Sequence, residues 1–245
     1  MIGLGTIVNV AAVIAGGVAG TFVKNGLPQK FKTIIMQAIG LSVLIIGISG
    51  TLQGIFRVAD GGTLDRQFIM TMIFSLVIGG ILGEWIDIED RLEKLGQWFQ
   101  SKLAKGERDF AQGFVTASLI YCVGAMAIVG SLEDGLTGNT DTLFAKSILD
   151  GVSAVVFAAT MGIGVSFSAL SVLFYQGSIT LLAGLIKPML NDVVISQMSL
   201  VGSVLILCIG ITLLEIKKMK VGNMLPAVFI PFIFYVLQKL YALTF

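Results

Sequence analysis

Small hydroxyl side chains gather around a glycine-rich stretch in the most apolar part of this chain. No charged residue occurs between Asp150 and Lys187, and the middle of that run reads Met161-Gly162-Ile163-Gly164-Val165-Ser166-Phe167-Ser168. The hydroxyl residues nearby are Ser153, Thr160, Ser166, Ser168 and Ser171. A helix that breaks here frees backbone N–H groups, which suit an anion or a carboxylate, and carbonyl groups, which suit a small cation. The pattern predicts a binding site for a small solute or ion at Thr160, Ser166 and Ser168, although such hydroxyls also commonly bond back to their own helix.

Two amides and one acid extend this candidate site. Asn9 lies in the first apolar run and Gln176 near the middle of the sixth, and each can bind a solute or bond a neighbouring helix. Asp150 follows Lys146 by four residues, a spacing that lets the two side chains pair on one helix face. Two interpretations of Asp150 stand side by side: a solvated pair at the outer end of the fifth run, or a gate or cation ligand at an outer vestibule.

The composition argues against an enzyme. The chain has no histidine, which removes the Ser–His triad and the His-bearing zinc motifs. No phosphate loop of the Gly-Lys-Ser/Thr type occurs. Cys122 and Cys208 both lie inside apolar runs, where small buried residues are the expected interpretation. We therefore expect no catalytic residue, no metal site and no cofactor.

The elements that must position these residues are membrane helices. Of the 245 residues 56% are hydrophobic and 13% are charged, against about 25% charged in soluble domains. The apolar runs are long and do not alternate, which predicts an all-α integral membrane protein whose surroundings are the lipid bilayer. The net charge of +1 argues against nucleic acid as a partner. We predict about eight segments, at residues 2–23, 31–55, 66–86, 110–131, 143–163, 166–186, 193–214 and 222–243.

Basic residues alternate between the connections and set the expected orientation. They follow the first, third and seventh segments, whereas the 132–146 connection is acidic. The positive-inside rule then places both termini outside the cytoplasm. This count holds whether 143–187 forms two full spans or a re-entrant hairpin with a broken helix near 160–168, so both remain open.

Three further patterns concern packing. Residues 87–105 carry apolar side chains at spacings of three and four, which predicts an amphipathic interfacial helix. Residues 1–56 and 66–135 look like an internal repeat, a duplicated hairpin within a single transmembrane domain spanning 1–245. Glycines four apart recur in both halves and predict close helix packing, inside the chain or in a homodimer: Gly16, Gly20, Gly79 and Gly83.

Several motifs resemble one family of bacterial membrane proteins. They are Gly5–Asn9, Ile35–Leu41, Ser118–Ser131, Lys146–Gly151, Gly162–Ser168, Tyr175–Gly177 and Asn223–Ala227. Along almost its whole length the chain is similar to the YqgA/YdfK-like family, long filed as a domain of unknown function. The resemblance implies a polytopic protein of the bacterial inner (plasma) membrane, with transport as the suggested role, and it brings no substrate and no assigned site residues.

Together these patterns favour a small secondary transporter or channel for a small solute or ion. The alternative is a membrane sensor or an assembly partner of another membrane protein, which transports nothing. In that case the 87–105 helix and the 132–146 connection would be its contact surfaces.

Overall fold

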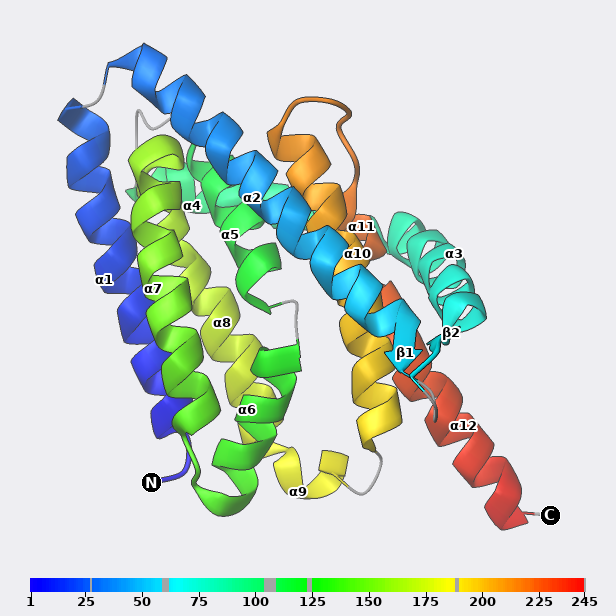
Figure 1. Cartoon of the computed structure of the whole chain (residues 1–245). Coiled ribbons are helices and arrows are strands. Elements are labelled where there is room, and N and C mark those ends of the chain that lie inside the picture. Colours follow the sequence, from blue (N-terminus) through cyan, green and yellow to red (C-terminus); the bar gives the residue numbers. More distant parts are fainter. Residues whose placement is uncertain (27, 59–61, 104–108, 123–124, 188–189, 245) are drawn as a thin grey trace. The chain divides into compact units, whose positions relative to one another are not determined.

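The computed structural model describes residues 1–26, 28–58, 62–103, 109–122, 125–187 and 190–244 (Figure 1). Its chain divides into two compact units, one formed by residues 1–39 and 90–186 and the other by residues 40–89 and 187–245. Helix α2 (Gln29–Ile55) contributes to both units, since the division falls between Ile39 and Gly40. The predictions of a single transmembrane domain and of the 1–56 and 66–135 repeat stay predictions.

Among the described residues, seven helices are long and apolar enough to cross a membrane. The pair α5 (Phe110–Cys122) and α6 (Ala125–Thr137) adds an eighth if it counts as one span, although the two helices are bent by 63°. The seven spans are Leu4–Val23, Thr33–Ile55, Ile69–Ile86, Asp141–Met161, Gly164–Leu181, Asp192–Leu213 and Val221–Leu240. These match the predicted segments closely, because an uninterrupted apolar run of about 20 residues is the strongest signal a membrane helix leaves in a sequence.

Three long helices lie side by side in the first unit: α1 (Leu4–Gly26), α7 (Asp141–Met161) and α8 (Gly164–Leu181) (Figure 1). Helix α1 packs along α7 and also against α8, and α5 and α6 pack against α8. The short helix α9 (Ala183–Ile186) follows α8. The unit's core includes the fully buried side chains of Phe110, Phe114, Tyr121 and Leu143.

Helix α4 (Ile88–Leu103) covers most of the predicted amphipathic segment, and residues 104 and 105 lie outside the described part. Phe99 turns into the first unit, where its ring centroid lies 6.1 Å from that of Phe114 and 5.6 Å from that of Phe167. Trp98, the next residue round the helix, is 54% exposed. One face of α4 therefore packs on protein, and an aromatic side chain remains outside, as suits an interfacial helix.

The second unit contains α3 (Ile69–Ile86), α10 (Asp192–Leu213), α11 (Val221–Met224), the 3-10 helix η2 (Leu225–Phe229) and α12 (Ile230–Thr244). A small antiparallel hairpin, β1 (Phe56–Val58) with β2 (Leu64–Arg66), precedes α3. Helix α10 begins at an Asn191 cap, whose side chain accepts a hydrogen bond from the Val194 N–H at 2.8 Å. Pro226 lies in the first turn of η2, where the N–H it lacks is not needed.

Candidate functional site

A buried ion pair lies near the middle of α7. The Lys146 Nζ is 2.6 Å from the Asp150 Oδ2, and the two side chains are 8% and 10% exposed. Asp150 is the tenth of the 21 residues of α7, so at about 1.5 Å per residue it lies roughly 15 Å from either end. This differs from the expected position near an outer helix end. A charge pair so deep in an apolar helix is costly, and such residues usually serve a function.

Two amides from other helices join this pair. The Asn9 Nδ2 on α1 donates to the Asp150 Oδ2 at 3.0 Å and to the Gln176 Oε1 on α8 at 3.3 Å. Both amide side chains are fully buried. These two bonds use both hydrogens of the Asn9 amide group, while the Asn9 Oδ1 and the Gln176 Nε2 have no hydrogen-bond partner among the described residues. We call Asn9, Lys146, Asp150 and Gln176 the central cluster.

An aromatic side chain from α5 borders the central cluster. The Lys146 Nζ lies 6.0 Å from the centroid of the Tyr121 ring, within the range of a cation–π interaction. The Tyr121 hydroxyl is 3.4 Å from the Ser153 Oγ, which also donates to the backbone carbonyl of Asp150 at 3.0 Å. Tyr121 was not among the predicted site residues, because one tyrosine within an apolar run carries no signal until its neighbours are known.

Close packing of α1 on α7 brings Asn9 within reach of Asp150. A Cβ on Gly16 would overlap the carbonyl oxygen of Gly151, and a Cβ on Gly20 would overlap that of Val155. Small residues at these positions let the two helices approach. Gly16 and Gly20 thus face α7 of the same chain, and the homodimer stays a prediction.

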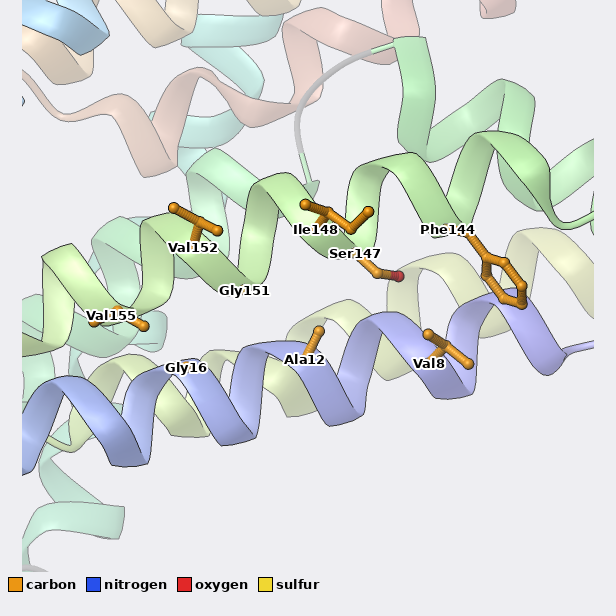
Figure 2. Close-up of a pocket in the computed structure, with 9 residues that line it drawn as sticks. All are labelled: Val8, Ala12, Gly16, Phe144, Ser147, Ile148, Gly151, Val152 and Val155. Atoms are coloured by element: carbon orange, nitrogen blue, oxygen red, sulfur yellow. The ribbon is translucent and has the colours of Figure 1, made fainter.

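An apolar groove of about 530 Å³ lies at the surface of the first unit, along the contact between α1 and α7, which we call the α1–α7 seam (Figure 2). Val8, Ser147 and Gly151 line it, and each is the neighbour in sequence of a central-cluster residue. Since consecutive helical residues point about 100° apart, the groove and the central cluster lie on different sides of the seam. The exposed Ile148 and Val152 side chains on the groove suit contact with lipid.

The start of α1 is held by an acid that the sequence did not single out. The Asp134 Oδ1 accepts a hydrogen bond from the Gly3 N–H at 2.9 Å, and its Oδ2 accepts one from the Gly5 N–H at 3.1 Å. Asp134 belongs to α6 and is fully buried. A carboxylate that binds free N–H groups at a helix start is favourable, so Asp134 fixes the end of the helix that carries Asn9.

The predicted hydroxyl site lies apart from the central cluster. Helix α7 ends at Met161, Gly162 has a φ of +82°, and α8 begins at Gly164, so the chain does break where expected. However, both helices have the length of a full span, which puts the break at their ends rather than midway. Ser166 is ten residues, about 15 Å of helix, from Gln176.

The individual hydroxyls are mostly engaged with their own helices. The Thr160 Oγ1 donates to the Phe157 carbonyl at 2.8 Å and the Ser168 Oγ to the Val165 carbonyl at 2.6 Å. The Ser166 Oγ is buried, has no partner among the described residues, and lies where Gly17 leaves room for it. The structure thus brings Asn9, Asp150 and Gln176 together and leaves Thr160, Ser166 and Ser168 elsewhere.

A second polar group joins the end of α3 to α11 in the second unit. Glu84 is paired with Lys220 and accepts a hydrogen bond from the Asn223 Nδ2 at 2.7 Å, while the Asn223 Oδ1 accepts one from the Glu89 N–H at 2.6 Å. The Glu84 carboxylate raises the pKa of Lys220 above its ordinary value, chiefly through their hydrogen bond.

This junction is packed as closely as the α1–α7 seam. A Cβ on Gly83 would overlap the Asn223 carbonyl oxygen, and one on Gly79 would overlap the backbone of Ala227. The Glu84, Lys220 and Asn223 side chains all have partners here, so this junction fits a structural role.

The second unit also has a pocket of about 330 Å³ between α3, α10 and α12, bordered by Phe74, Ser75, Gln197 and Tyr235 among others. Its lining residues carry no formal charge. The central cluster is therefore the stronger candidate for binding an ion.

Comparison with known proteins places the chain in a family. Residues 4–236 match the model of a family described as "Protein of unknown function (DUF554)". The chain belongs to this family. It is 35% identical over 227 residues to the "Uncharacterized membrane protein YdfK" of Bacillus subtilis (strain 168), covering 93% of each chain. It is 30% identical over 229 residues to the "Uncharacterized protein YqgA" of Escherichia coli (strain K12), covering 91% of this chain and 92% of that one.

These relatives confirm the resemblance predicted from the motifs. A membrane-protein relative and the seven apolar helices of spanning length among the described residues together identify a multi-pass α-helical membrane protein. No solved structure matches the chain.

Proposed function

We propose that the protein is a secondary transporter or channel that moves a small solute or ion across the bacterial plasma membrane. The observation that carries the proposal is the central cluster, in which a buried ion pair adjoins two amide atoms that have no partner among the described residues. Polar groups of this kind at membrane depth are costly to keep, and they commonly line pathways for ions and solutes. The cluster performs binding and no chemical step, so the proposed role is not enzymatic.

The distribution of basic residues supports an orientation for this transporter. The positive-inside rule favours both termini outside the cytoplasm, as the connections after α1 and α4 and after α10 are rich in lysine and arginine. In that orientation the turn at Gly162 faces the cytoplasm, and Asp150 lies near the bilayer centre.

Passage of a solute requires the central cluster to open. Asn9 on α1 donates one hydrogen bond to Asp150 on α7 and one to Gln176 on α8. A solute that replaces the first bond would loosen α1 from α7, and one that replaces the second would loosen α1 from α8. The Asn9 Oδ1 and the Gln176 Nε2, which have no partner in the part of the chain that the structure describes, give such a solute an acceptor and a donor before any existing bond breaks. We propose that movement of the α7–α8 hairpin against α1 then exposes the cluster to one side or the other.

Access of water to the central cluster tests this proposal. Cys122 and Cys208 are first replaced by alanine, and single cysteines are then introduced as Asn9→Cys and Gln176→Cys. We expect a small cationic methanethiosulfonate reagent to modify both in membranes at least tenfold faster than it modifies Val13→Cys. Val13 is a matched control because it is an apolar residue, equally buried, and one turn from Asn9 on α1.

Slow modification at all three positions in folded protein would contradict transport through the central cluster. That outcome would favour the sensor or assembly partner, in which polar side chains merely bond neighbouring helices. Folding of each variant is checked by size-exclusion chromatography and thermal unfolding, so that a reactive cysteine in misfolded protein is not mistaken for a water path.

A further inference from the structure

The pocket of the second unit lies where faces of three helices meet. Its volume is about 330 Å³, and the three helices that form it, α3, α10 and α12, pack against one another in pairs. Thr71 and Ser75, one turn apart, line it from α3, while Gln197 lines it from α10 and Tyr235 from α12. Ligand pockets commonly measure about 300–1,000 Å³ and combine an apolar lining with a few polar groups. We call this space the three-helix pocket.

One hydroxyl group of the three-helix pocket is buried without a hydrogen bond. Ser75 is 1% exposed, and its Oγ has no partner among the described residues. Hydroxyls on membrane helices commonly donate to the carbonyl one turn back, as Thr51, Ser203 and Thr212 of the same unit do. A buried polar group that stays unpaired is unfavourable. Ser75 therefore offers an unused donor and acceptor to a molecule in the pocket.

The rest of the lining favours an uncharged ligand with an apolar body. None of the described residues that line the pocket carries a formal charge. An ion in such a site, without a counter-charge, is costly. The rings of Phe74, Phe234 and Tyr235 supply apolar surface instead. The ligand that fits is therefore uncharged, and it needs one polar group to reach Ser75.

The depth of the pocket suits a molecule with one polar and one apolar part. Ser75 is the seventh residue of α3 and Gln197 the sixth of α10, so at about 1.5 Å per residue both lie within about 10 Å of the start of their helices. The pocket is thus closer to one surface of the membrane than to the bilayer centre. Amphipathic groups such as tyrosine are favoured at this level.

We propose that the three-helix pocket binds a small uncharged alcohol or phenol, whose hydroxyl pairs with the Ser75 Oγ and whose apolar body packs on Phe74 and Phe234. A ligand hydroxyl can donate to the Ser75 Oγ or accept from it, so one hydrogen bond satisfies the buried group. A carboxamide would bring further donors and acceptors that the aromatic wall leaves unpaired. This inference does not depend on the proposed transport function, because it uses no residue of the central cluster.

The test measures binding of thymol, an uncharged phenol, to the full-length protein in lipid nanodiscs. Isothermal titration calorimetry gives the Kd, and empty nanodiscs of the same lipid correct for partitioning into the bilayer. We expect saturable binding at one site. The hydrocarbon p-cymene, which is thymol without its hydroxyl, should bind at least about fivefold more weakly, as the loss of one hydrogen bond implies. Cuminate, a carboxylate of similar size, should not bind.

Variants separate the hydroxyl of Ser75 from the apolar wall. Ser75→Ala should weaken thymol binding about fivefold and leave p-cymene within twofold of the wild type. Without ligand, Ser75→Ala should unfold at the same temperature as the wild type or higher, because it removes an unpaired buried hydroxyl. The matched control is Ser203→Ala, whose lost hydroxyl bonds the Ser199 carbonyl at 2.9 Å, and it should leave thymol binding within twofold. Phe234→Ala should weaken thymol and p-cymene alike.

Four results would overturn the inference: thymol binds the protein no more than it binds empty nanodiscs, p-cymene or cuminate binds as tightly as thymol, Ser75→Ala keeps its thymol affinity, or ligand-free Ser75→Ala is destabilised. The last result would show that the Ser75 hydroxyl already has a structural partner. None of them alters the cysteine labelling at positions 9 and 176, so the proposed transport function is tested separately.

Discussion

Asp134 should contribute more to stability than any sequence pattern around it indicates. Its two carboxylate oxygens bind the Gly3 and Gly5 N–H groups from a fully buried position. Hydrogen bonds to a charged group contribute about 1.5–3 kcal/mol each, and a carboxylate at a helix start adds a favourable interaction with the helix dipole. We therefore expect Asp134→Ala to lower the free energy of unfolding by about 3–5 kcal/mol. Asp134→Asn, which keeps one acceptor oxygen and loses the charge, should lose about half as much.

The assay is reversible unfolding of the purified protein by sodium dodecyl sulfate in mixed micelles, followed by circular dichroism. Hydrogen exchange of the first eight residues gives a local measurement, because the Gly3 and Gly5 amides should exchange faster in Asp134→Ala. The matched control is Glu133→Gln, which alters the adjacent acid of α6. Glu133 is only half-buried and accepts one hydrogen bond from Thr142 at 2.7 Å, so its loss should stay within about 1 kcal/mol.

A loss below about 1 kcal/mol in Asp134→Ala, with unchanged exchange at the start of α1, would refute this reasoning. Equal losses of unfolding free energy in Asp134→Ala and Glu133→Gln would refute it as well, since they would show that any acid of α6 has the same effect.

Two further predictions concern the second unit. Gly79→Ala should lower the free energy of unfolding by about 1–3 kcal/mol, because its Cβ would overlap the Ala227 backbone, whereas Gly80→Ala, with open space around the new methyl group, should be neutral or slightly stabilising in the same unfolding assay; equal effects would contradict the packing. Because the pKa of Lys220 is raised in the folded protein, its pair with Glu84 should stabilise fully below the ordinary lysine pKa of about 10.4 and lose its effect as the pH rises through the raised value. The difference in thermal stability between wild type and Lys220→Met should thus be constant from pH 7 to pH 10 and then shrink, and a difference that disappears below pH 9 would contradict this.

Local sequence signals located most of the helices. Seven of the eight predicted apolar runs correspond to spanning helices among the described residues, because an apolar run of sufficient length is what lets a helix cross a bilayer, and the run at 110–131 falls on the bent pair α5 and α6. The spacing of Lys146 and Asp150 also indicated their pairing, since residues four apart in a helix are neighbours.

The assembly of the central cluster could not be predicted in the same way. Asn9 meets Asp150 across 141 residues of sequence, and that contact depends on which face of α1 packs on α7. The glycines at 16 and 20 indicated a close contact without naming the partner. The hydroxyl site near Ser166 was selected by composition, but helix rise separates it from Gln176 by about 15 Å.

The depth of Asp150 was misjudged for a physical reason. Asp150 was expected near the outer end of the fifth segment, which was predicted to span residues 143–163. The helix begins at Asp141, close to the predicted start, so Asp150 is its tenth residue, and the pair with Lys146 lets this acid lie inside the apolar segment.

Placing both charges on one helix has a consequence for biosynthesis. Inserting a lone lysine or aspartate at the centre of a membrane helix costs about 2.5–3.5 kcal/mol on the scale set by the translocon. Lys146 and Asp150 neutralise each other within one turn of α7, so this segment can leave the translocon as an uncharged hydrogen-bonded unit. Helix α1, made more than 100 residues earlier, contributes the uncharged Asn9 to the central cluster. The residues of the central cluster can therefore enter the membrane one helix at a time, and their polar contacts form when α7 and α8 pack against α1.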